Sequence, residues 1–171
     1  MIALLQQFCS KDQTRESITT PFSIGAFTYA TDGRIMIRVA QISGVGDAGE
    51  ILAKTAPKMF SSWTGVGDWK PLPDPFVVVD PPRDCQECDA SGWHECDCGH
   101  EHPCAKCDGK GKITSELKDQ VKFGEHTLAG HYVRLASTLP GVQMRESAGG
   151  RSEPVGLHFD GGEGLLMPLR T

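Results

Sequence analysis

Four cysteines in two closely spaced pairs carry the strongest chemical signal in the sequence. Cys85 and Cys88 form the first C-x2-C pair, Cys104 and Cys107 form the second, and 15 residues separate the pairs. A C-x2-C turn presents two thiolates at about 2.3 Å to a tetrahedral Zn²⁺, and two such turns complete its coordination. Because no position is left open for water, the pattern predicts a structural zinc site.

The surroundings of these cysteines favour a metal over other uses of sulfur. Ordinary buried cysteines lie in apolar runs, whereas these lie among Asp, Glu, Lys and Gly. Of the seven cysteines only Cys9 lies outside the segment 85–107; it follows an apolar helix face and is expected to be a core thiol. An iron–sulfur cluster and a redox pair are the alternatives to zinc.

A second group of metal-ligating residue types lies between the two pairs. Cys96 and Cys98, with two of His94, His100 and His102, could hold a second zinc ion. The alternative is a solvated loop whose cysteines support the first site. A zinc ion with an open position here could activate water, so a hydrolase is a further alternative.

The second cysteine pair opens a motif of a known family. Residues 104–111 match the C-x-x-C-x-G-x-G repeat of the cysteine-rich domain of DnaJ-type chaperones, and residues 85–92 resemble a degenerate copy. In that family the outer repeats share one zinc and the inner repeats another, which is similar to the assignment above. The resemblance covers fewer than 30 residues and omits the J domain, so it supports metal binding and says little about chaperone activity.

Charge is unevenly distributed along the cysteine-rich segment. Residues 85–103 contain five acids and neither Lys nor Arg, which disfavours phosphate binding there. Four lysines follow and are candidate contacts to a nucleic-acid backbone, with scattered surface lysines as the alternative. They are Lys106, Lys110, Lys112 and Lys118.

The residues before the cysteines predict the first half of an α+β domain. We expect a helix over 2–9 and strands over 26–31 and 34–39, joined at Asp32-Gly33 by a type I′ turn. Asp47 and Glu50 suggest a capping box at the start of a helix that Pro57 ends. A loop over 61–75 and a buried strand over 76–79 complete this half.

The residues after the cysteines predict a second half of the same kind. A strand begins at Val121, a helix runs over 132–139 and stops at Pro140-Gly141, and strands follow near 142–147, 154–160 and 163–169. The predicted organisation is therefore one α+β domain made of residues 1–82 and 113–171, with a zinc module inserted at 83–112.

Two short motifs in these halves resemble the bacterial sliding clamp, the processivity factor of DNA polymerase. Residues 29–34, Y-A-T-D-G-R, resemble the A-T-D-G-x-R hairpin of the clamp, and residues 164–170, G-L-L-M-P-L-R, resemble its M-P-x-R end. The resemblance implies a clamp-like domain whose helices face DNA. An unrelated α+β domain is the alternative.

The sequence departs from the clamp pattern in several respects. It has one domain where a clamp chain has three, so closing a ring would require a homo-oligomer. No strand precedes the helix at 2–9. The helices that would face DNA offer a thin basic lining, made of Lys11, Arg15, His131 and Arg134.

Composition narrows the functional classes. The 171 residues suit one domain, and a net charge of −5 argues against bulk attraction to nucleic acid. No stretch approaches the roughly 20 apolar residues of a membrane helix, and the N-terminus lacks the features of a signal peptide, so a cytoplasmic location is expected. The absence of P-loop, G-x-S-x-G and H-E-x-x-H motifs favours a non-enzymatic protein without a small-molecule substrate.

Together these observations predict a zinc-binding, clamp-like accessory protein of DNA metabolism, of phage or bacterial origin, that contacts DNA or a replication protein. The alternative is a protein-interaction adaptor or inhibitor that binds no nucleic acid. It would use the zinc module and the tryptophans Trp63, Trp69 and Trp93.

Overall fold

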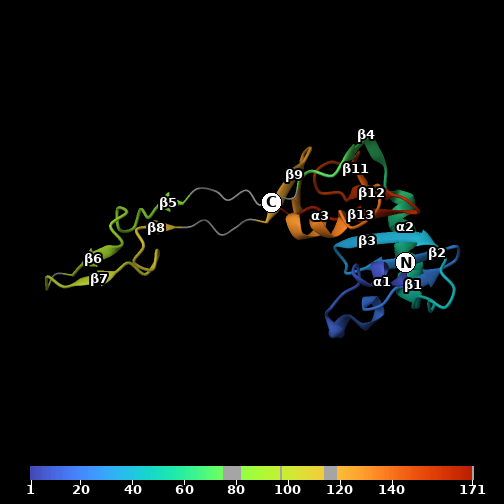
Figure 1. The fold of residues 1–171 in the computed structure, drawn as a ribbon, viewed down its shortest axis with the longest axis horizontal. Coiled ribbons are helices and arrows are strands. Elements are labelled where there is room, and N and C mark those ends of the chain that lie inside the picture. Colours follow the sequence, from blue (N-terminus) through green and yellow to red (C-terminus); the bar gives the residue numbers. More distant parts are fainter. Residues whose placement is uncertain (75–81, 97, 114–118, 171) are drawn as a thin grey trace. The chain divides into compact units, whose positions relative to one another are not determined.

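A computed structural model describes residues 1–74, 82–96, 98–113 and 119–170. The chain divides into two compact units: unit 1 comprises Met1–Phe76 and Gln120–Thr171, and unit 2 comprises Val77–Asp119 (Figure 1). The predicted strand over 76–79 and the candidate Lys118 lie outside the described residues. The described part of the chain contains no helix that is long and apolar enough to cross a membrane.

Unit 1 is built on one antiparallel sheet, so the α+β prediction is confirmed. The sheet has seven strands in the order β1-β2-β3-β13-β12-β11-β4 (Figure 1). Its strands are β1 (Phe22–Ile24), β2 (Phe27–Thr31), β3 (Ile35–Ala40), β4 (Gly65–Pro71), β11 (Gln143–Ser147), β12 (Val155–Phe159) and β13 (Gly162–Leu166). The other elements of unit 1 are α1 (Ile2–Gln6), the 3-10 helix η1 (Gln13–Ile18), α2 (Glu50–Ser62), β9 (Gln120–Phe123), β10 (His126–Ala129) and α3 (Gly130–Ala136).

The sheet joins two halves of similar element order. Each half has a helix, α1 or α3, followed by three strands that pair in sequence. The last strands of the halves, β3 and β13, pair with each other antiparallel, with Ile37 opposite Gly164. A Cβ at Gly164 would lie 2.8 Å from the carbonyl oxygen of Met36, so this central pairing depends on glycine at that position.

Strand β3 separates two hydrophobic cores, because successive side chains of a strand point to opposite faces. Ile35, Ile37 and Val39 join the larger core, to which α1, α3 and the β9–β10 hairpin also contribute. Met36 joins the smaller core with Tyr29 and residues of α2. The period-two pattern in the sequence therefore predicted the strand correctly, and helices cover both faces of it.

The hairpin at Asp32-Gly33 is confirmed, but the type I′ turn is wrong. Positive φ occurs at Gly33 (90°) and not at Asp32. The Asp32 carboxylate instead accepts hydrogen bonds from the amides of Arg34 (2.8 Å) and Ile35 (3.1 Å). An Asx-type turn made by the aspartate side chain thus replaces the predicted backbone turn.

Helix α2 differs from its prediction at both ends. Gly49 precedes the helix and provides no side-chain cap. Asp47, predicted to open a capping box, instead forms an isolated parallel β-bridge with Ser23. Pro57 lies inside the helix, which continues to Ser62. The continuation packs Phe60 against Tyr29, with ring centroids 6.0 Å apart, and this tertiary contact compensates for the hydrogen bond that proline cannot donate.

The loop predicted over 61–75 contains an edge strand, β4, paired with β11. Glycine and proline are tolerated there because the register shifts along the pairing and the outer edge needs no partner. Trp63 and Trp69 are partly buried rather than free loop residues: Trp63 Nε1 donates to the Pro154 carbonyl at 2.9 Å, and the Trp69 ring lies 5.5 Å from that of His158. These two tryptophans therefore belong to the packing of the sheet.

The tip of the β2–β3 hairpin is tied to both neighbouring helices of unit 1. Tyr132 on α3 donates its hydroxyl to Asp32 Oδ2 at 2.6 Å, and Arg15 in η1 donates to the Asp32 carbonyl at 2.7 Å. Burial, with the Asp32 carboxylate, raises the pKa of Tyr132, so the phenol remains a donor at neutral pH. Asp32 therefore connects two segments far apart in the sequence.

Replacement of Tyr132 by Phe should destabilise unit 1 by about 1–2 kcal/mol, because it removes a hydrogen bond to a charged group. Thermal unfolding of the variant checks this. Tyr29→Phe is the matched control, since the Tyr29 hydroxyl has only a 3.5 Å contact to Arg38 Nη1. Equal destabilisation by both substitutions would contradict the proposed importance of the Tyr132–Asp32 bond.

Candidate metal centre

The two C-x2-C pairs fold as two copies of one turn. In each copy the amide five residues after the first cysteine donates to that cysteine's carbonyl oxygen, at 2.9 Å in the first copy and 3.1 Å in the second. A glycine two residues further on donates its amide to the second cysteine's sulfur: Gly92 to Cys88 Sγ at 3.2 Å, and Gly111 to Cys107 Sγ at 3.3 Å. These donors favour the thiolate form that a metal requires.

Both copies use left-handed backbone at the same positions. Asp89 and Ala90 have φ of 46° and 63°, and the equivalent Asp108 and Gly109 have 53° and 74°. A non-glycine residue in this region costs about 1–2 kcal/mol. Ala90 carries this cost at the position where the second copy has Gly109. The departure of the first copy from the repeat is therefore the less favourable choice for the backbone.

The two copies are joined by reciprocal backbone hydrogen bonds. The Cys85 amide donates to Gly111 at 2.9 Å, and the Cys104 amide donates to Gly92 at 2.7 Å. Short antiparallel pairs continue on both sides of these bonds. They are β5 (Arg83–Asp84) with β8 (Lys112–Ile113), and β6 (Trp93–Glu95) with β7 (Glu101–Pro103).

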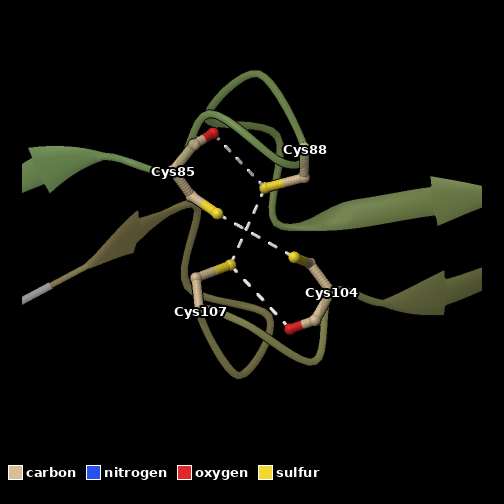
Figure 2. A group of neighbouring side chains, drawn as sticks. All are labelled: Cys85, Cys88, Cys104 and Cys107. Atoms are coloured by element: carbon tan, nitrogen blue, oxygen red, sulfur yellow. Dashed lines mark hydrogen bonds between the residues drawn. The ribbon is translucent and has the colours of Figure 1, made fainter.

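The four cysteine sulfurs converge on one point between the copies (Figure 2). Cys85 Sγ lies 3.9 Å from Cys104 Sγ, and Cys88 Sγ lies 3.7 Å from Cys107 Sγ. Four thiolates at about 2.3 Å from one tetrahedral ion would be roughly 3.8 Å apart. All four side chains are buried, and the spacing, burial and amide donors fit a metal ion.

The thiols of the cluster differ in acidity. Burial raises the pKa of Cys88 to about 11, and the neighbouring thiols add to the effect. Burial also acts on Cys104, but the backbone amides of Cys107 and Lys106 and the side chain of His94 outweigh it and lower its pKa to about 6. Binding of a cation would therefore release protons, chiefly from the less acidic thiols.

The second predicted group forms in part. Cys96 and Cys98 are joined by a disulfide, and Cys98 Sγ lies 3.2 Å from His100 Nδ1. Their ligand atoms lie close enough together that these three residues could hold a metal ion once the two cysteines are reduced. The structure does not bring His94 or His102 into it.

His94 and His102 lie opposite each other on β6 and β7, with their rings 6.0 Å apart. His102 Nδ1 donates to the His94 carbonyl at 2.7 Å. The His94 side chain interacts with Cys104 of the four-cysteine cluster. Strand pairing thus places His94 beside His102 and leaves His100 with the two cysteines at the hairpin tip.

The lysines proposed as nucleic-acid contacts lie among acids. Lys106 pairs with Glu87 at 3.0 Å, and Lys110 lies 3.7 Å from Asp108. Lys112 is exposed on β8. Residues 83–113 contain seven acids and four bases, and four thiolates around a divalent ion would add two further negative charges. Unit 2 is therefore a poor surface for phosphate.

A basic cleft in unit 1 combines Arg15 and His131, which the sequence offered as a basic lining, with Arg34 and Arg170, which it did not. The hairpin tip and the C-terminal segment meet there, and the Met167 amide donates to the Arg34 carbonyl at 2.8 Å. The cleft has a volume of about 780 Å³ and is lined by Arg15, Arg34 and Arg170 together with His131. No carboxylate is among its described lining residues. Both motifs that resemble the sliding clamp thus contribute an arginine to one cleft.

Comparison of the chain with protein families, with curated proteins and with solved structures gives no match.

Replacement of Gly111 by Ala should disrupt the four-cysteine cluster, because its Cβ would overlap the Ala90 carbonyl oxygen of the other copy. Gly99→Ala is the matched control: Gly99 also has positive φ, but nothing lies within 4 Å of its Cβ position. We expect Gly111→Ala to lose metal to a chelator at least about tenfold faster, equivalent to about 1.4 kcal/mol. Indistinguishable release rates would show that the two turns need not pack this closely.

Proposed function

We propose that Cys85, Cys88, Cys104 and Cys107 hold one structural Zn²⁺. The observation that supports this is a buried set of four sulfurs at tetrahedral spacing, each copy with an amide donor aimed at a sulfur. Thiolate ligands favour zinc over harder cations. With four protein ligands the ion has no open position, so it supports folding and takes no part in a reaction.

The zinc content of the protein tests this assignment. Native mass spectrometry of protein purified without reductant should show one zinc ion per chain, and Cys104→Ser should lose it. Cys9→Ser should keep the ion, because the buried Cys9 thiol donates to the Leu5 carbonyl in unit 1. Hydrogen exchange should show loss of protection in unit 2 alone after chelation. Retention of zinc by Cys104→Ser would contradict the assignment.

We further propose that the protein is a non-enzymatic, clamp-like accessory factor of DNA metabolism that contacts DNA through the basic cleft of unit 1. Three features support the proposal: the two motifs that resemble the clamp lie in contact, each half has a helix followed by three strands, and the described lining of the cleft contains arginines and no carboxylate. Arginine is suited to phosphate because its planar fork donates two hydrogen bonds at once.

The acidic unit 2 supports a different role for the zinc module. Lys106 and Lys110 lie beside acids and the module carries more acids than bases, so it is better suited to a basic protein surface than to DNA. Trp93 is 49% exposed on β6 and would supply an aromatic anchor. This observation keeps the protein-interaction adaptor as the second candidate function.

Charge reversal in the cleft tests the DNA proposal. Arg34→Glu and Arg170→Glu should each weaken duplex-DNA binding at 50 mM salt at least about tenfold, and each should lower the slope of log K against log salt by about 1. Lys110→Glu in unit 2 is the control and should bind like the wild type. If the wild type does not bind DNA, or if Lys110→Glu has the larger effect, the proposal is wrong.

A further inference from the structure

The hairpin of β6 and β7 carries two cysteines whose surroundings differ from those of the buried cluster. The Cys96 amide donates to the His100 carbonyl at 3.0 Å, and the Gly99 amide donates to Cys96 at 2.8 Å, so both cysteines lie at the tip of the hairpin. Cys98 and His100 are exposed, and Cys96 is partly exposed. Solvent-borne reagents can therefore reach this disulfide, which is the first requirement for thiol exchange.

We propose that Cys96, Cys98 and His100 form a redox-gated metal site, distinct from the four-cysteine cluster. In the oxidised state the disulfide occupies both sulfurs, and neither can act as a thiolate ligand. In the reduced state the two thiolates and the His100 imidazole bind a soft divalent cation such as Zn²⁺. The proposal goes beyond the DNA-binding role and does not depend on it.

The gating reaction is a thiol–disulfide exchange with a dithiol. One thiolate of the dithiol attacks a sulfur of the Cys96–Cys98 bond, and the bonding electron pair leaves on the other cysteine as a thiolate. The second thiol of the reagent then attacks the mixed disulfide, which releases the reduced protein and a cyclic disulfide of the reagent. Two electrons and two protons pass to the protein. Zn²⁺ binding then releases the two thiol protons, and oxidation by a small-molecule disulfide reverses the sequence.

The position of His100 supports a role as ligand. Its Nδ1 already lies 3.2 Å from Cys98 Sγ, so an ion between them needs only a small adjustment of the side chains. His102 is excluded from that role at Nδ1, which donates to a backbone carbonyl. Three protein ligands leave a fourth position for water or for a ligand from a partner.

The charges around the hairpin also favour a cation. Glu95 and Glu101 face each other across β6 and β7, directly beside the tip. Both carboxylates are exposed, and residues 93–103 contain neither Lys nor Arg. Cations are therefore attracted to this end of the module, and the attraction increases when the disulfide becomes two thiolates.

Native mass spectrometry with one added equivalent of ZnCl₂ tests the proposal on the full chain. After oxidation with a small-molecule disulfide, the wild type should carry one zinc ion; after reduction with a phosphine and its removal, it should carry two. The double variant Cys96→Ser/Cys98→Ser should carry one ion in both states. The ion of the four-cysteine cluster is the internal reference and should be present in every sample. Its loss would contradict the structural zinc site, so the two proposals can fail separately.

A pair of histidine variants distinguishes a specific three-ligand site from non-specific binding of Zn²⁺ to the two thiolates. In competition with a chelator, His100→Ala should weaken binding of the second ion at least about tenfold. His102→Ala, with the same loss of an imidazole on the same hairpin, should have no such effect. Equal zinc content in the oxidised and reduced states would overturn the proposal, as would a second ion that persists in the double cysteine variant or is insensitive to His100→Ala.

Discussion

The convergence of four sulfurs in unit 2 is the interaction on which the order of the module depends. Among the described residues, the partly buried Ile113 is the one hydrophobic side chain besides the cysteines that packs in this cluster, so hydrophobic burial contributes little there. The short strands on either side pair two or three residues each. Their register depends on the two C-x2-C turns being held together, and an ion bound at the cluster would supply that cross-link and with it folding free energy. Unit 1, by contrast, is stabilised by hydrophobic burial, with a core on each face of a continuous sheet.

The fold was predictable where local pattern and tertiary environment agree. Alternation over 34–39 places Ile35 and Ile37 in one core and Met36 in the other, and the observed strand follows it. The prediction failed where a distant partner decides the outcome. Pro57 would end an isolated helix, but Phe60 finds its contact with Tyr29 only if the helix continues. Likewise β4 is a strand because β11 lies beside it, which its glycines and prolines do not reveal.

The sites show the same division. The C-x2-C spacing sets the local geometry of each turn, so the four-cysteine cluster could be predicted from residue types and their spacing alone. The basic cleft could not, because Arg34 and Arg170 come together only through the central pairing of β3 with β13. The second group was predicted to include two histidines, but the structure brings one to it. Strand pairing places His94 opposite His102 and leaves His100 beside the cysteines at the tip.

Burial gives the two thiol groups of one small module different chemistry. Cys85 is fully buried and its amide donates to Gly111 of the other turn, so an oxidant or a chelator can reach its sulfur only if the two turns separate. Cys98, on the same module, is exposed at a hairpin tip, where a thiol in solution can reach its disulfide. Reduction at the tip would therefore change the local charge and the number of available ligands without requiring the buried cluster to open. An ion at the buried cluster would be a lasting cross-link beside an exchangeable disulfide, and the module would then combine a stable scaffold with a reversible chemical change.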